Sequence, residues 1–187
     1  MNIEATTLQH RVQELRQRRA ARASAAGPLA SVPGEGQVFR LDGSRLVDVA
    51  AVYLELGQRL EPTFGYYGAC LDSLDDCLSG GIGGVCAPFQ LTVTDGQTLA
   101  NSLNWQAWFR YSAVTDFAEG SPEISDLVEA GRLPEIDPEE AFQILRRVAA
   151  GEPITDAWAE RFDLKRVSFW ESLVALLQRH GVNVVMV

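Results

Sequence analysis

The sequence predicts an α/β fold in which a three-stranded parallel sheet is flanked by helices and carries an inserted helical block. Three short stretches, 37–43, 88–94 and 182–187, have the alternating or apolar pattern of strands. Helical segments separate these stretches, and a helix that links two strands of one sheet makes them parallel. With 187 residues, 47% of them hydrophobic, the chain can bury the core of one domain.

Residues 1–35 are predicted to form an N-terminal helical arm and linker, ahead of a domain at 36–187. Within the arm, residues 2–23 have helical periodicity, and residues 24–36 have the composition of a linker. The thin apolar stripe of this helix consists of Ile3, Leu8, Val12 and Leu15. Two interpretations stay open: a mobile arm with a frayed helix, or a helix that dimerises or docks.

The first strand is predicted at 37–43, where apolar and polar residues alternate before an Asp-Gly turn. Residues 45–60 then carry apolar side chains at helical spacing, and Pro62 follows the predicted helix end. A glycine run at 79–84 lacks the lysine of a phosphate-binding loop and follows a helix rather than a strand, so it is interpreted as a turn. The second strand is predicted at 88–94.

The helical insert is predicted at about 99–167, within a longer helical region that begins at 97. Its segments are a long aromatic helix to 118, short helices at 124–130 and 154–163, and a helix that begins at Asp137 with Pro138 in its first turn. Its tryptophans are expected to add core or to supply contacts with a partner. The last helix is predicted at 170–180, with His180 at its C-terminus and Gly181 after it. A closing strand at 182–187, mostly apolar, is expected to be covered on both faces.

The stretch 64–78 combines two tyrosines, a turn and an acidic helix. Its apolar residues fall on one helical stripe formed by Cys70, Leu71, Leu74, Cys77 and Leu78. Cys70 and Cys77 are accordingly expected to be buried core thiols. For Tyr66 and Tyr67 two interpretations stay open, core or turn aromatics and partner contacts, and one ring inward with one outward would satisfy both. The three acids Asp72, Asp75 and Asp76 crowd one side of the same helix. Like charges at this spacing weaken a helix, so we interpret them as a docking surface; a simply solvated face is the alternative.

The charge and cysteine content restrict the classes of function. The net charge is −9, yet residues 1–30 carry +3, so the remaining body carries −12. An acidic body repels nucleic acid and favours a basic protein partner. Three cysteines, a polar N-terminus and the absence of an apolar run of about 20 residues favour a cytoplasmic protein that spans no membrane. Two histidines and no Cys-x-x-Cys pattern predict no metal site, and no cofactor or catalytic set is predicted.

The motif Tyr-Tyr-Gly-x-x-Leu-Asp-x-Leu-x-Asp-x-Leu, which begins at Tyr66 and ends at Leu78, resembles the barstar family of ribonuclease inhibitors. The flanking elements agree over residues 37–98 and about 168–187. The resemblance implies a bacterial immunity protein of the toxin–antitoxin type, whose acidic helix and preceding loop block the active site of a cytotoxic ribonuclease. The partner would be a cognate basic nuclease toxin. The resemblance places the toxin-binding residues at Tyr66, Gly68, Cys70, Leu71, Asp72, Asp75, Asp76 and Gly80.

Departures from the family pattern favour a toxin other than barnase. Cys70 stands where the family has asparagine, and Asp75 and Gly81 stand where it has tryptophans. Leu176 replaces a glutamate of the last helix. An alternative is therefore an immunity or regulatory protein that neutralises a non-ribonuclease toxin or effector. An enzyme that uses the carboxylates is the third hypothesis, although three acids on one helix face share one environment and suit acid–base catalysis poorly.

Overall fold

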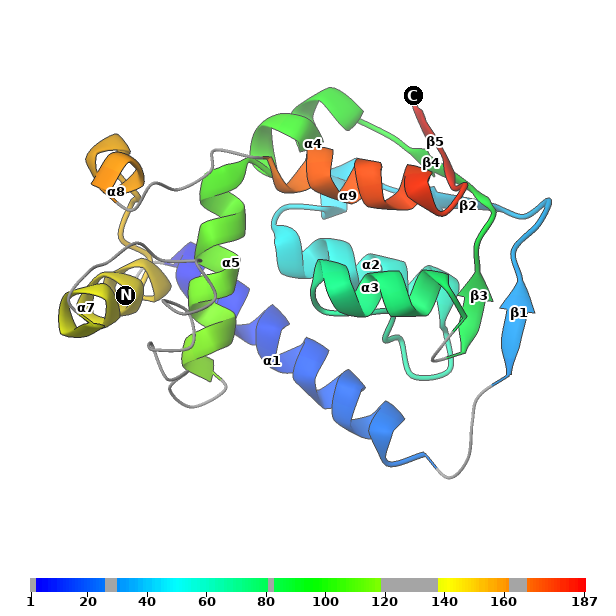
Figure 1. Ribbon diagram of the computed structural model, residues 1–187, viewed down its shortest axis with the longest axis horizontal. Coiled ribbons are helices and arrows are strands. Elements are labelled where there is room, and N and C mark those ends of the chain that lie inside the picture. The colour runs from blue at the N-terminus through cyan, green and yellow to red at the C-terminus, as the bar shows by residue number, and fades with distance from the viewer. Residues whose placement is uncertain (1–2, 26–29, 81–82, 119–137, 162–167) are drawn as a thin grey trace.

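The computed structural model describes residues 3–25, 30–80, 83–118, 138–161 and 168–187 (Figure 1). The main sheet has three parallel strands in the order β2 (Val38–Leu41), β4 (Gln90–Val93) and β5 (Asn183–Met186). This confirms the predicted α/β fold and three-stranded parallel sheet. The predicted helix at 124–130 lies outside the described residues.

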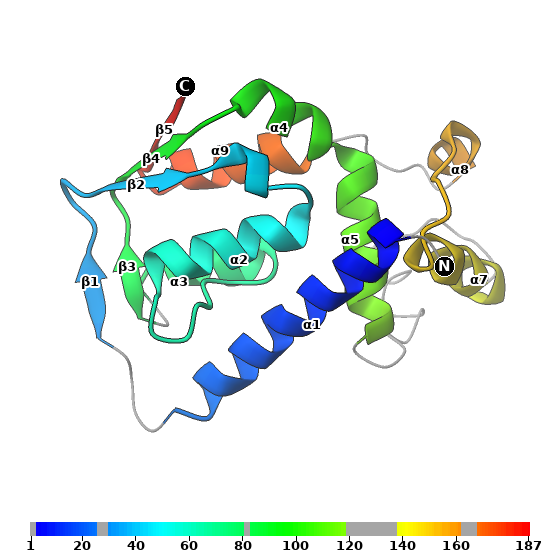
Figure 2. The ribbon, with the colours of Figure 1, turned by 180° about the vertical axis from the view of Figure 1, so that it is seen from behind.

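Helices pack on one face of this sheet. α2 (Val49–Leu60) and α9 (Phe169–Arg179) lie beside the strands, and α3 (Leu71–Leu78) runs next to α2 (Figures 1 and 2). Asp48 caps α2 because its carboxylate accepts a hydrogen bond from the Ala51 amide at 2.8 Å. The predicted start at 45 was therefore early: Gly43–Arg45 form a 3-10 turn, η1, before the cap.

The last strand is an edge strand, so the expectation that it is covered on both faces was wrong. β5 pairs only with β4 in the main sheet, and Met186 and Val187 are exposed. Val184 packs against the core, whereas Asn183 faces solvent. The apolar composition of the strand therefore reflects one buried face and an exposed edge rather than two covered faces.

A second, two-stranded parallel sheet was not predicted. It pairs β1 (Ser31–Pro33) with β3 (Gly84–Cys86) and lies at the end of the molecule beyond α3 (Figure 1). β1 falls in the segment that was interpreted as a linker, and β3 follows the glycine run. Three-residue strands beside glycine and proline leave no alternating pattern that sequence reasoning could detect.

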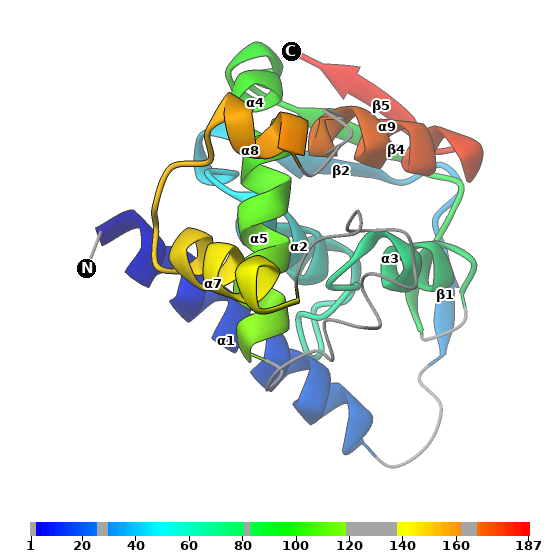
Figure 3. The ribbon, with the colours of Figure 1, turned by 60° about the vertical axis from the view of Figure 1, so that its left-hand side comes forward.

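The helical insert begins with two helices rather than one. α4 (Gly96–Ser102) ends before Asn104, and α5 (Trp105–Ala118) follows. The Asn104 side chain accepts hydrogen bonds from the amides of Gln106 and Ala107 at 3.0 and 3.1 Å, which starts a new helix at this point. α7 (Pro138–Ala149) packs against α5. α8 (Asp156–Arg161) lies above α7 in the view of Figure 3.

The N-terminal helix lies on the body of the molecule. α1 (Ile3–Ala23) crosses below α2 and reaches α5, on the side of α2 away from the main sheet (Figures 1 and 2). Leu8, Val12 and Leu15 are buried in the common core, so the predicted apolar stripe has an intramolecular partner. α1 also reaches the insert: the Arg16 guanidinium donates to the Thr115 carbonyl at 3.2 Å.

Candidate functional site: the α3 helix and the loop before it

A capping box starts α3 one residue after Cys70. The Ser73 amide donates to the Cys70 thiol at 3.4 Å, and the Ser73 hydroxyl accepts from the Cys70 amide at 3.0 Å. Cys70 is exposed, so the expectation of a buried thiol was wrong there: the residue caps the helix and does not belong to its stripe. Cys77 is buried as predicted, and burial raises the pKa of its thiol to about 12.

Asp72 and Asp76 form an exposed acidic pair on α3. They are four residues apart, which places their Cβ atoms about 6 Å from each other on one side of a helix. Within the described part of the chain, neither carboxylate has a hydrogen bond or an ion pair. Asp72 lies in the first turn, where the helix dipole favours a negative charge, whereas Asp76 lacks this compensation. We call these two residues the acidic pair.

Asp75 differs from the acidic pair because it has partners within the chain. Its Oδ1 accepts a hydrogen bond from the Arg179 guanidinium at 2.9 Å and contacts His180 Nε2. These hydrogen bonds, from His180 first and Arg179 second, lower the pKa of the Asp75 carboxyl. Asp75 thereby joins α3 to the C-terminal end of α9, where His180 is the C-cap residue.

The lowered pKa of Asp75 predicts a pH-dependent contribution to stability. Since the pKa in the folded state lies below the ordinary value of 3.8, the contribution is complete above that pH and is lost as the pH falls through the folded-state pKa. Asp75→Asn should therefore lower the urea midpoint near neutral pH, and the deficit should shrink from about pH 5 downward. Asp76→Asn, one residue further on, is the control. An equal, pH-independent deficit in both variants would contradict this assignment.

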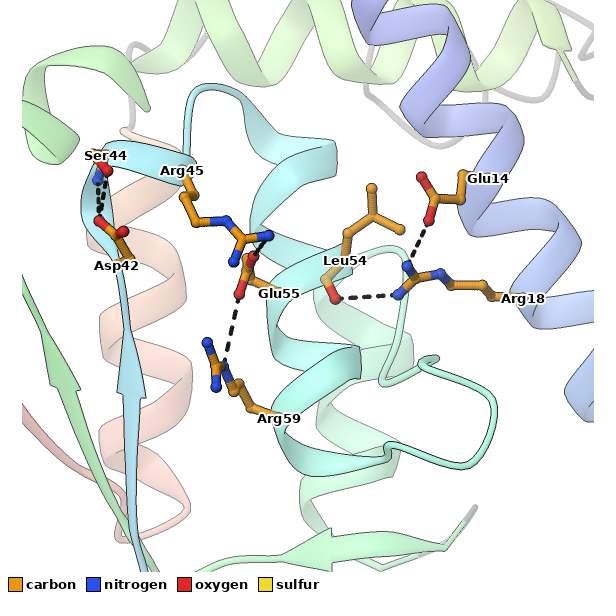
Figure 4. Close-up of polar contacts among 8 residues, drawn as sticks. All are labelled: Glu14, Arg18, Asp42, Ser44, Arg45, Leu54, Glu55 and Arg59. Atoms are coloured by element: carbon orange, nitrogen blue, oxygen red, sulfur yellow. Dashed lines mark hydrogen bonds and ion pairs between the residues drawn. The ribbon is translucent and has the colours of Figure 1, made fainter.

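The loop before α3 is held by Glu61 and by α1. The buried Glu61 carboxylate accepts from the amides of Phe64 at 3.0 Å and Tyr66 at 3.5 Å. The Gly65 carbonyl accepts from the Arg18 guanidinium of α1 at 2.9 Å. The same Nη1 atom donates to the Leu54 carbonyl of α2 at 3.3 Å, and Glu14 orients the other end of the guanidinium (Figure 4). The loop backbone is thus fixed to both helices.

Both tyrosines of the motif are buried, so of the two interpretations left open the structure favours core aromatics. Tyr66 is 6% exposed and Tyr67 has no exposed surface. The Tyr67 hydroxyl donates to the Val85 carbonyl of β3, which satisfies the polar end of a buried ring. Next to them, the Tyr111 hydroxyl of α5 donates to the Ala69 carbonyl.

The two glycines among the predicted site residues have backbone roles. Gly68 has φ +96°, and a Cβ there would meet the Leu74 amide nitrogen at 2.9 Å, so this position favours glycine on two grounds. Gly80 has φ +83° and follows the end of α3, where its amide donates to the Cys77 carbonyl at 2.9 Å.

The eight predicted toxin-binding residues therefore divide by exposure. Cys70, Asp72 and Asp76 are exposed, and Leu71, Asp75 and Gly80 are partly exposed. Tyr66 and Gly68 are buried and offer little surface to a partner in this conformation.

Three residues that shape the loop were not singled out from the sequence: Arg18, Glu61 and Tyr111. Arg18 and Tyr111 lie 47 and 42 positions from their partners in the loop, so no local motif links them to it. Glu61 lies only three and five positions from the amides that it binds, but an acidic residue at a helix end gives no specific signal of this role.

The positions that depart from the family pattern differ in where the structure places them. Leu176 is 7% exposed and faces the core, so it does not replace a polar contact. Gly81 lies outside the described residues. Among the tryptophans of the insert, Trp105 and Trp108 are partly buried against the core, and the Trp108 ring packs edge-on against Phe169 with centroids 5.8 Å apart.

Residues 36–121 match the family model described as Barstar (barnase inhibitor). Over these residues, just under half of the chain, the sequence is similar to the barstar family. The matched segment contains the loop, α3, β2 to β4 and the start of the predicted insert, whereas α1, α9 and β5 lie outside it. Neither a curated protein nor a solved structure matches the chain significantly.

Barstar-family proteins are inhibitors rather than enzymes, and the acidic pair lies in the segment that matches the family. Among the described residues, no three His, Cys, Asp or Glu side chains lie close enough together to hold a metal ion. In the same part of the chain, no helix is long and apolar enough to cross a membrane.

Proposed function

We propose that this chain is an immunity protein that binds a cytotoxic ribonuclease and blocks its active site with α3 and the loop before it. The observation that carries the proposal is the acidic pair: Asp72 and Asp76 are exposed and unpaired within the described part of a domain similar to the barstar family. The neighbouring Asp75, by contrast, is engaged by Arg179 and His180.

The chemistry of a ribonuclease suits such an inhibitor. An enzyme that cleaves RNA must hold phosphate groups with cationic side chains, and carboxylates can occupy the same anion sites through charge-assisted hydrogen bonds. Two like charges four residues apart destabilise an isolated helix by about 0.2–0.5 kcal/mol. A cationic active site would relieve this repulsion, so the acidic pair gains more from binding than a single carboxylate would.

The remaining predicted contacts take two roles in this proposal. Cys70, Leu71 and Gly80 lie at the ends of α3 and border the acidic pair on the surface. Tyr66 and Gly68 act from inside by shaping the loop, and Asp75 acts by holding α3 against α9. The bacterial, cytoplasmic setting belongs to the same proposal, because a cell that makes such a toxin needs protection where its RNA is.

The test is inhibition of the nuclease encoded beside this chain in its genome, with purified barnase as a second enzyme. We expect a stoichiometric complex with the cognate nuclease and loss of RNA cleavage in its presence. Because the body of the chain carries −12, the association rate should fall as salt is raised, while the dissociation rate changes little. An association rate that does not depend on salt would contradict electrostatic steering by an acidic surface.

A non-ribonuclease target is the second candidate. It is favoured by Leu176, which is buried where the family pattern has a glutamate, and by Asp75, which is paired within the chain where the pattern has a tryptophan. Both differences remove contacts suited to barnase. If the neighbouring toxin binds this chain but cleaves no RNA, this candidate replaces the first.

A further inference from the structure

α1 lies outside the segment that matches the family, yet it makes direct contact with the loop that precedes α3. Its apolar side is anchored by Leu8, Val12 and Leu15, which are buried in the common core. Arg18 extends from the next turns of the same helix, and its side chain is 17% exposed. The position of the guanidinium is therefore set by packing on one side and by the ion pair with Glu14 on the other.

The Arg18 side chain forms hydrogen bonds to both α2 and the loop. It donates to the Leu54 carbonyl of α2 (Figure 4). It also donates to the Gly65 carbonyl of the loop. Gly65 has φ +66°, and a Cβ at this position would meet Arg18 Nη1 at 2.7 Å, so the guanidinium packs directly on the loop backbone. A buried carbonyl needs a hydrogen-bond partner, and a guanidinium provides several donors in a fixed geometry.

The following turn of α1 continues along the same region. Burial raises the pKa of the Tyr66 hydroxyl, and the positive charge of Arg19 opposes that shift. Burial likewise raises the pKa of the Cys77 thiol in α3, against the charge of Arg22. The charges of Arg19 and Arg22 thus oppose the effect of burial on one group of the loop and one of α3, whereas Arg18 contacts the loop directly.

We propose that α1 is a clamp that fixes the loop at residues 64–69 in one conformation, and that Arg18 is its positioning residue. The clamp comprises Arg18 with the carbonyls of Leu54 and Gly65. The effect of the clamp on toxin binding rests on the proposed function. A loop that is already ordered loses less conformational entropy when it binds a partner, so the clamp makes binding tighter. α1 is then part of the inhibitory apparatus, although it contributes no residue to the acidic pair.

Hydrogen exchange of the full chain tests the clamp without any toxin. In Arg18→Met, which keeps the alkyl part but removes the donors, the amides of Phe64, Gly65 and Ala69 should exchange at least about tenfold faster than in the parent. The amides of β4 should keep their exchange rates. Arg18→Lys retains one donor group and should give intermediate loop protection. Arg40→Met, which removes an exposed arginine from β2, is the matched control and should change neither set.

Two outcomes would overturn the clamp: unchanged exchange of the loop amides, or an equal acceleration at every amide, which would indicate global destabilisation alone. The dissociation of the complex with the nuclease is measured in a separate experiment. If the loop loosens in Arg18→Met but the complex dissociates at the parental rate, the clamp stands and the loop is not in the interface. If the loop is unchanged, the clamp is wrong whether or not a nuclease is bound.

Discussion

The double variant Asp72→Asn with Asp76→Asn should bind the cognate nuclease at least about a thousandfold more weakly than the parent. Removing one partner of a buried, hydrogen-bonded charge pair costs about 2–5 kcal/mol, a range to which barnase–barstar complexes themselves contributed. Two such losses on one helix face share partners, so their free energies are not strictly additive. A total loss of about 4 kcal/mol in binding free energy already corresponds to a thousandfold weaker affinity. The loss should appear mainly in the dissociation rate, measured by surface-based or stopped-flow kinetics.

Asparagine keeps the shape of aspartate, so the double variant should remain folded. Both side chains are exposed and lack partners in the described part of the chain, and its unfolding free energy should stay within about 0.5 kcal/mol of the parent. Glu35→Gln with Asp95→Asn removes the same number of charges from exposed positions outside α3 and controls for net charge. Parental affinity in the Asp72 and Asp76 variant would show that the proposed face is not the binding face.

Gly57→Ala should destabilise the chain by about 2 kcal/mol, although alanine is the better helix former. Replacing a glycine inside a helix by alanine normally gains up to about 1 kcal/mol. Gly57, however, lies in α2 directly under the loop, and a Cβ there would meet the Gly65 carbonyl oxygen at 2.0 Å and its carbon at 2.5 Å. Because these neighbours are backbone atoms, the loop must move, and forced packing of this kind costs about 1–3 kcal/mol or more.

Urea unfolding of Gly57→Ala measures this cost. Gln58→Ala, at the next and exposed position of α2, should change the unfolding free energy by less than about 0.5 kcal/mol. A displaced loop would also lose the hydrogen bond from Arg18 to Gly65, so binding of the nuclease should weaken along with stability. If Gly57→Ala is more stable than the parent, the gain in helix propensity outweighs the clash with the Gly65 carbonyl. The loop would then not pack directly on α2.

Local signals account for what the sequence predicted correctly. The alternating strands, Pro62 after the second helix and Gly181 after the last helix each specify structure within a few residues. The apolar stripe and the acids of α3 are also local signals. The spacing of these residues along the sequence predicts both the helix and its exposed acidic pair. The parallel sheet follows from the order of these elements.

The parts that were missed depend on partners far along the chain. Asp75 looked equivalent to Asp72 and Asp76, but its partner Arg179 is 104 positions away. The thin stripe of α1 predicted a helix without indicating that it packs on α2 and α5. Cys70 was assigned to the apolar stripe because sulfur can serve either as a core group or as a weak hydrogen-bond acceptor, and spacing alone does not distinguish the two.

The pairing of β5 with β4 sets the order in which the molecule can be completed during synthesis. Asn183 and Gln90, which face each other in this pairing, are 93 positions apart, and the residues between them include the whole insert. A ribosome adds about 5–20 residues per second, so β2, α2, α3 and β4 exist for several seconds before their third strand. During that interval β4 has a free edge, and Asp75 of α3 has neither Arg179 nor His180. The helix that carries the acidic pair therefore reaches its final surroundings only when the last residues of the sheet have been made.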